Sequence, residues 1–219
     1  MKKLYNIFII IFLILFLTAC APIQAEPVTI VETIVVTETV EVENTERIDE
    51  LESEVQQYQN LIANLNDLLK NIYYVYGEGG GTWVEGIGFA LEYKNKFYLI
   101  TAGHAVDGEW GIHKNLGFKS IDNEWIYPKL LTYEVTDTVP DYAIYYSDKI
   151  DNGLEYDLNN SEPDYRLGIN KLIQENNNWG VDGECGSPII DLDGEVIGIH
   201  VGYLSDIDNV LEAIDSLEK

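Results

Sequence analysis

Short runs of β-branched and aromatic residues, separated by turn residues, make up most of the chain after residue 82. Two pairs of these runs have the spacing of β-hairpins: 87–93 with 97–101, and 188–190 with 195–200. The second pair is joined through an Asp-Gly step, which is a strong hairpin signal. Many short strands predict an all-β domain built as an antiparallel barrel.

A helical pattern occurs only near the end of this region, where apolar residues recur at helical spacing from Ile207 to Leu217. Ser205 is the expected N-terminal cap of this helix. We assign residues 73–219 to the globular domain and expect the glycine-rich segment 77–81 to be a flexible break at its start.

Composition excludes several classes of protein. The chain has 219 residues, of which 46% are hydrophobic, so it can form a packed core. A net charge of −25 disfavours nucleic acid as a partner. With Cys20 and Cys185 as the two cysteines, a disulfide framework and a four-cysteine zinc site are excluded. We expect no metal and no cofactor, and we expect His113 to lie on the surface.

The first twenty residues have the layout of a secretory signal. Lys2 and Lys3 precede an apolar run, and small residues follow it in Leu17-Thr18-Ala19-Cys20. This tetrapeptide resembles the lipobox of bacterial lipoproteins. The resemblance implies cleavage before Cys20, lipid on its thiol, and an extracytoplasmic protein anchored to a bacterial cell membrane. An ordinary signal peptide (residues 1–20) that ends in cysteine is the alternative.

Residues 21–45 are rich in Val, Thr and Glu, and we interpret them as an extended spacer, with a β-strand as the alternative. Residues 46–72 carry apolar side chains at alternating steps of three and four: Ile48, Leu51, Val55, Tyr58, Ile62, Leu65, Leu69 and Ile72. This heptad pattern predicts a coiled-coil stalk and a homo-oligomer, in which Arg47 and Glu52 can pair between chains. The alternative is a single amphipathic helix that packs back on the globular domain.

Three segments contain the residue types of a nucleophilic catalytic site. His104 follows a strand in Thr101-Ala102-Gly103-His104, Asp141 enters the apolar run 141–146, and Cys185 lies in the glycine-flanked turn 183–187. A cysteine nucleophile needs a base to accept its proton, and the base needs an acceptor that orients it. The order His, Asp, nucleophile is that of the chymotrypsin-like arrangement.

These segments, together with 194–202, resemble chymotrypsin-like double-β-barrel peptidases, in particular viral cysteine proteases and bacterial glutamyl endopeptidases. The resemblance covers roughly residues 82–219. It implies that His104 is the general base, Asp141 its orienting residue and Cys185 the nucleophile, with the N–H groups of Gly183 and Cys185 as the oxyanion hole. Most bacterial relatives have serine where Cys185 stands. Asp137 is the alternative orienting residue.

The resemblance also implies a specificity pocket. Gly198, His200 and Gly202 match a Gly-x-His-x-Gly stretch that lines the S1 subsite, where the imidazole binds the side-chain oxygen of a P1 Gln or Glu. Residues 73–219 contain 27 acidic and 9 basic side chains, which favours Gln over Glu. A core histidine is the alternative for His200. The expected function is a membrane-anchored cysteine endopeptidase; the alternative is an inactive peptidase fold that serves as a surface binding module.

Overall fold

The computed structural model describes residues 39–79, 82–108, 111–113, 115–136, 139–159, 165–169, 171–174 and 183–219. The expected signal peptide and Cys20 lie outside these residues, as does most of the spacer. Asp137 also lies outside them. Among the helices of the described part, none combines the length and the apolar character needed to cross a membrane.

The first sheet has seven strands in the order β7-β6-β1-β2-β3-β9-β8, and every neighbouring pair is antiparallel. Its strands are β1 (Ile72–Gly79), β2 (Thr82–Tyr93), β3 (Lys96–Thr101), β6 (Gly117–Lys119), β7 (Trp125–Ile126), β8 (Lys129–Val135) and β9 (Asp141–Tyr146). A small ribbon of β4 (Asp107–Gly108) and β5 (Gly111–Ile112) follows the 3-10 helix η1 (Gly103–Ala105). The predicted hairpin of β2 and β3 is confirmed, with Lys94 and Asn95 at positive φ in the turn.

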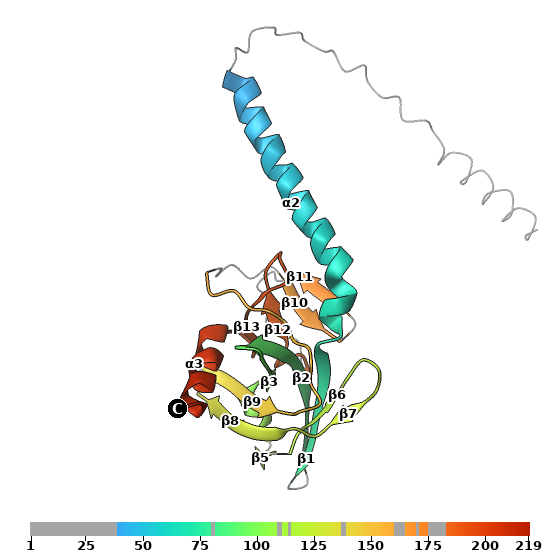
Figure 1. Cartoon of the computed structure of the whole chain (residues 1–219), viewed down its shortest axis with the longest axis vertical. Helices are drawn as coiled ribbons and strands as arrows, with labels where there is room; N and C mark the ends of the chain where they lie inside the picture. The colour runs from blue at the N-terminus through green and yellow to red at the C-terminus, as the bar shows by residue number, and fades with distance from the viewer. Residues whose placement is uncertain are drawn as a thin grey trace, which may run out of the picture. The chain divides into compact units, whose positions relative to one another are not determined.

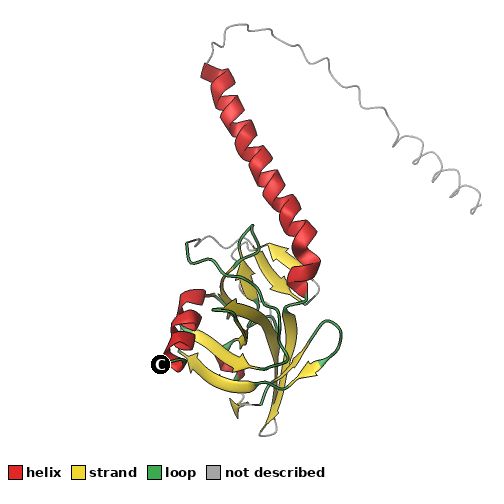
Figure 2. Cartoon of the chain, viewed as in Figure 1, coloured by secondary structure: helices red, strands yellow, loops and turns green. Residues whose placement is uncertain are grey.

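The second sheet has five strands in the order β11-β10-β12-β13-β14. They are β10 (Tyr165–Gly168), β11 (Lys171–Gln174), β12 (Pro188–Ile190), β13 (Val196–His200) and β14 (Leu204–Asp206). The terminal helix α3 (Ile207–Leu217) packs its apolar side chains into the core, as predicted. Its N-cap residue is Asp206, so the prediction that Ser205 caps it is wrong: Ser205 lies buried in β14. Figures 1 and 2 show both sheets with α3 beside them.

The long helix α2 (Thr39–Leu69) begins inside the segment that was expected to be extended, so that expectation is wrong for residues 39–45. Its C-terminal turns belong to the globular core. Leu61 and Leu69 are buried there, and Tyr58, Leu65 and Leu68 pack against the same cluster. The heptad pattern overruns the helix, because Ile72 opens strand β1. For this half of α2 the structure therefore favours the alternative, a helix packed on its own domain.

Two further predictions, those for residues 77–79 and for His113, are corrected by the strand pairing and by the hydrophobic clusters. One cluster joins α2, α3 and residues from both sheets, and the other fills the inner side of the first sheet. Gly77 and Gly79 belong to β1, which pairs with β2 over its whole length, so residues 77–79 are strand and not a flexible break. His113 is only 4% exposed, because it follows β5 into the first-sheet core, and its surface assignment is wrong.

Candidate active site

The structure brings His104 and Asp141 together although 37 residues separate them. His104 lies in η1 directly after β3, and Asp141 opens β9, which pairs with β3. The carboxylate makes two bonds: Oδ1 accepts the backbone N–H of His104 at 2.9 Å, and Oδ2 lies 2.6 Å from the imidazole Nδ1. Asp141 is 4% exposed, so this pair is shielded from water on the carboxylate side.

Gly103 makes this close approach possible. A Cβ at this position would collide with the backbone oxygens of Glu134 and Tyr142, and it would lie 2.9 Å from Oδ1 of Asp141. Glycine before the histidine therefore lets η1 lie directly on β8 and β9. The local sequence distinguishes His104, but this packing requirement at Gly103 depends on strands far away in the chain.

Cys185 reaches the same histidine from the second half of the domain. Its side chain is half-buried and lies near enough to the imidazole to contribute to the raised pKa of His104. The imidazole thus has Asp141 on one side and a thiol on the other, which is the arrangement of a nucleophile, a base and an orienting carboxylate.

The protonation of His104 follows from these contacts. Burial of the imidazole disfavours its charged form, but the hydrogen bonds and charges of Asp141 and Cys185 outweigh this effect and raise the pKa of His104 to about 10. At neutral pH the structure therefore favours an imidazolium between two acceptors.

The turn 183–187 is held rigidly by backbone hydrogen bonds. The C=O of Cys185 accepts a hydrogen bond from the N–H of Ile87 at 2.9 Å. The N–H of Gly186 donates to the backbone carbonyl oxygen of His200 at 2.7 Å. Gly186 has φ +92°, and a Cβ there would collide with the carbonyl oxygen of Ile87. Within the described part of the chain, the N–H groups of Gly183 and Cys185 donate to no other backbone group.

Behind this turn lies a buried ionic cluster that the sequence analysis missed. Glu184 pairs with Arg166 of β10 at 2.9 Å and also with Lys171 of β11. Arg166 NH1 donates to Nε2 of His200 at 2.8 Å. Arg166 and His200 are 2% and 0% exposed. Burial and the neighbouring guanidinium lower the pKa of His200 to about 4, with His104 adding to the shift and Glu184 opposing it.

The three residues expected in the specificity pocket have different surroundings. His200 is fully buried and its Nε2 is engaged by Arg166, so the structure does not present that nitrogen to a ligand. A Cβ at Gly198 would collide with Leu204, so this glycine serves the close pairing of β13 with β14. Gly202 has φ +86° and open space around it. Residues 175–182, which precede the turn 183–187, lie outside the described residues.

Ser205, which was predicted to cap the terminal helix, instead contacts the candidate site. Its Oγ accepts the backbone N–H of Asp141 at 3.4 Å, and its side chain is fully buried. It therefore supports the start of β9 from the second sheet. No local pattern around residue 205 indicates a contact with a residue 64 positions away.

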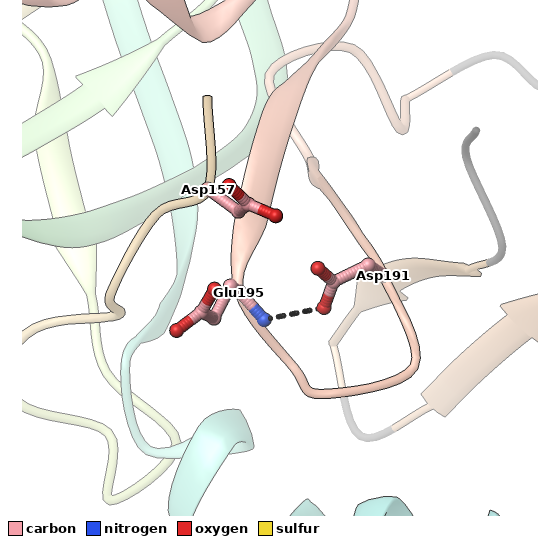
Figure 3. A group of neighbouring side chains, drawn as sticks. All are labelled: Asp157, Asp191 and Glu195. Carbon is pink, nitrogen blue, oxygen red and sulfur yellow. Dashed lines mark hydrogen bonds between the residues drawn. The ribbon is translucent and has the colours of Figure 1, made fainter. Parts of the chain in front are cut away.

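One acidic cluster has the donor atoms of a cation site. Asp157, Asp191 and Glu195, drawn in Figure 3, place carboxylate oxygens within 4.8 Å of one another. Asp191 Oδ1 already accepts the N–H groups of Asp193 and Glu195 at 3.0 and 2.9 Å. Burial and the neighbouring carboxylates raise the pKa of Glu195. The turn that Asp191 caps accounts for this geometry.

Comparison with known proteins supports the fold. No protein-family model matches the sequence, and no curated protein matches it by sequence. Among solved structures, the active form of the Rv3671c protease from M. tuberculosis superposes with a TM-score of 0.53 and 14% identity, covering 70% of this chain and 83% of that one. The serine endoprotease from Yersinia pestis gives a TM-score of 0.52 and 14% identity, covering 73% and 66%.

The chain has a chymotrypsin-like peptidase fold. The predicted fold class is therefore confirmed for the two antiparallel sheets and the C-terminal helix. At 14% identity the similarity concerns the fold, and the chemistry has to be argued from this chain's own residues.

Proposed function

We propose that the chain is a cysteine endopeptidase in which Cys185 is the nucleophile, His104 the general base and acid, and Asp141 its orienting residue. One observation carries the proposal: the imidazole of His104 is hydrogen-bonded to Asp141 at 2.6 Å, and the Cys185 side chain lies near enough to contribute to the raised pKa of His104. In this proposal Cys185 attacks as the thiolate, and the raised pKa of His104 supports the imidazolium that stands beside it. Both solved neighbours are named as proteases, which supports a peptide substrate.

In the proposed reaction, Sγ of Cys185 attacks the carbonyl carbon of the scissile bond. The carbonyl oxygen gains the negative charge, and the N–H groups of Gly183 and Cys185 donate to it. The His104 imidazolium gives its proton to the leaving amine as the C–N bond breaks. Neutral His104 then takes a proton from water, whose oxygen attacks the thioester, and the thiolate leaves. Asp141 holds Nδ1 throughout, so Nε2 exchanges the proton.

For the specificity pocket we propose a preference for Gln over Glu at P1. The His200 imidazole has a pKa of about 4, so at neutral pH it offers no positive charge to a carboxylate. We assign Gly202 to the rim of the pocket, and Gly198 and His200 to its supporting wall. The excess of acidic over basic side chains in residues 73–219 also disfavours an anionic P1 residue.

We further propose a lipid anchor on Cys20 and self-association through α2, which place the enzyme outside the cytoplasm on a bacterial membrane. Ile48, Leu51 and Val55 are 52%, 43% and 52% exposed on the half of α2 that does not pack on the core. A second copy in parallel covers this stripe and brings Arg47 close to Glu52 of the other chain. Cys20→Ser should release the protein into the soluble fraction; retention on membranes contradicts the anchor.

The experiment that tests the enzymatic proposal is labelling with a peptide that carries a thiol-reactive group. The full-length chain should be labelled at Cys185, and His104→Ala should slow this labelling strongly. Cys20→Ser is the control for the other cysteine and should leave the labelling of Cys185 unchanged. No labelling of the parent together with no turnover would assign the chain to an inactive peptidase fold that binds other molecules.

A further inference from the structure

A group of aromatic side chains lies on one face of the first sheet, across four neighbouring strands. We call the five side chains the aromatic face: Tyr74, Tyr76, Trp83, Trp125 and Tyr127. Trp83 and Tyr127 are 61% and 74% exposed, which is unusual for rings of this size. Figure 1 shows β7, β6, β1 and β2, the strands that carry or flank these residues.

Strand register places these side chains on the same side of the sheet. Tyr76 is paired with Gly117 on one side and with Glu85 on the other, and Glu78 is paired with Trp83. Residues paired across strands point to the same face, and so do residues two apart along one strand. Tyr74, Tyr76 and Glu78 of β1 therefore share a face with Trp83 and Glu85 of β2.

The rings of Trp125 and Tyr127 lie on this same face. A Cβ built at Gly117 would lie 2.9 Å from the Trp125 ring and 3.0 Å from the Tyr127 ring, so both rings cover the side to which Gly117 points. The two rings are stacked, with centroids 6.1 Å apart and planes 13° from parallel. Lys119 Nζ lies 5.9 Å from the Trp125 ring centre. The absent side chain at Gly117 thus creates a flat two-ring platform.

The opposite face of these strands packs into the first-sheet cluster, whereas on the side of the aromatic face Ile72 and Ile87 enter the other cluster and the aromatic residues lie beyond them. Val75 and Phe118 are paired, point the other way and are 0% exposed in the first-sheet cluster. Burial of apolar groups drives the inner face together. Trp83 and Tyr127 gain little such burial in the single chain, because they stay largely in water.

Along β2 the aromatic face lies a few residues from the turn 183–187 that carries Cys185. Ile87 of β2, which lies on the same face as Glu85 and Trp83, donates its N–H to the carbonyl oxygen of Cys185 at 2.9 Å. Glu85 lies two residues before Ile87 and Trp83 lies four before it, which is about 7 and 13 Å along the strand. An extended peptide covers that span with about two to four residues.

The charges of this face select the chemistry of its ligand. Glu78 and Glu85 are exposed beside the rings, and Lys119 is the basic residue that the register places there. Electron-rich ring faces next to carboxylates attract Lys and Arg side chains, and Trp attracts them most strongly. The same carboxylates, on a chain of net charge −25, disfavour anionic lipid.

We propose that the aromatic face is an exosite that binds a basic and aromatic segment of the substrate polypeptide, about two to four residues to one side of the scissile bond. The proposal rests on the proposed peptidase function and adds the substrate class to it. Cation–π contacts and ring stacking give the affinity, and Glu85 pairs with an Arg or Lys of the substrate. Cleavage then depends on residues well outside the P1 position.

Binding is measured without cleavage, on the full-length Cys185→Ala protein in detergent. The probe is a fluorescein-labelled hexapeptide of alternating Arg and Phe, and the matched control peptide alternates Glu and Phe. The basic peptide should bind at least tenfold more tightly. Trp83→Ala combined with Tyr127→Ala should weaken its binding roughly tenfold, the size of one well-shielded cation–π contact. Tyr146→Ala, which removes an exposed tyrosine elsewhere on the sheet, should leave binding unchanged.

Equal binding of the two peptides, or unchanged binding in the double variant, overturns the exosite. The same proteins are titrated with chitohexaose, a carbohydrate, and with phosphatidylglycerol vesicles, an anionic lipid surface. If the double variant loses binding to one of these ligands and keeps its binding to the basic peptide, the exosite is also overturned. The active protein supplies the second readout, a cleavage profile of a peptide library. The parent should enrich Arg, Lys and aromatic residues beyond P1, and the double variant should lose this enrichment. Peptide binding without any turnover refutes the peptidase proposal alone.

Discussion

Arg166 donates a hydrogen bond from its guanidinium to Nε2 of His200 at 2.8 Å, and both side chains are buried. The same guanidinium pairs at 2.9 Å with Glu184, which is the residue directly before Cys185. A buried charge is costly unless it is paired. This cluster therefore fixes the turn 183–187 against the second sheet through Glu184.

Replacing Arg166 should be far more damaging than replacing Lys171, although both contact Glu184. Arg166→Gln leaves Glu184 buried without its inner partner and should lower the free energy of unfolding by about 3–5 kcal/mol. Lys171 has a half-exposed side chain, so Lys171→Gln should cost less than about 1 kcal/mol. Urea unfolding of the two variants measures the difference. Equal losses would show that Arg166 is not the main partner.

Stability should depend on the neutral state of His200. The pKa of His200 in the folded chain is about 4, below its ordinary value of 6.5, so folding disfavours its protonation. Its contribution is complete above pH 6.5 and is lost as the pH falls towards 4. The thermal unfolding temperature should therefore fall more steeply between pH 7 and pH 4 in the parent than in His200→Gln. His200 faces Arg166, Glu184 and His104. Parallel curves for the two proteins would mean that the protonation of His200 does not lower the stability in this pH range.

The last turns of α2 should be essential for the stability of the globular domain. Leu61 is 2% exposed in the core, whereas its neighbour Ile62 is 65% exposed. Leu61→Ala should lower the free energy of unfolding by about 2–4 kcal/mol. Ile62→Ala should change it by less than about 0.5 kcal/mol when measured at low protein concentration. Similar effects at the two positions would contradict the docking of this helix face.

The other half of α2 should control self-association. Leu51→Lys puts a charge in the exposed apolar stripe, whereas Ser53→Lys puts the same charge on the opposite side of the helix. Sedimentation of the full-length chain in detergent should show an oligomer for the parent and for Ser53→Lys, and a monomer for Leu51→Lys. A parent that stays monomeric at high micromolar concentration would remove the coiled coil from the proposal.

The parts of the fold and site that could be predicted are those encoded by nearby residues. The hairpin of β2 and β3 was predictable because its pattern lies within fifteen residues. His104, Asp141 and Cys185 stood out because each follows or enters a strand in a distinctive short segment. The heptad pattern identified α2, but the same spacing suits a coiled coil and a helix docked on a sheet.

The contacts that sequence could not reveal connect residues far apart in the chain. Arg166 lies in a strand with no charge pattern and meets His200, 34 residues later. Ser205 looked like a helix cap because of its position before an amphipathic segment, yet it bonds Asp141 across the two sheets. No sequence pattern distinguishes Gly117. Its role depends on the rings of Trp125 and Tyr127, which cover it in the folded chain.

The central claim is tested most directly by the turnover of a peptide library by the full-length parent, Cys185→Ala, His104→Ala and Asp141→Ala. The parent should cleave, and Cys185→Ala should have no measurable kcat/KM. Removing the base should reduce kcat/KM roughly 10²–10⁴-fold. Asp141→Ala should cost less, because a thiol needs less help than a hydroxyl from the third residue. Cleavage by Cys185→Ala at the parent rate would contradict the account.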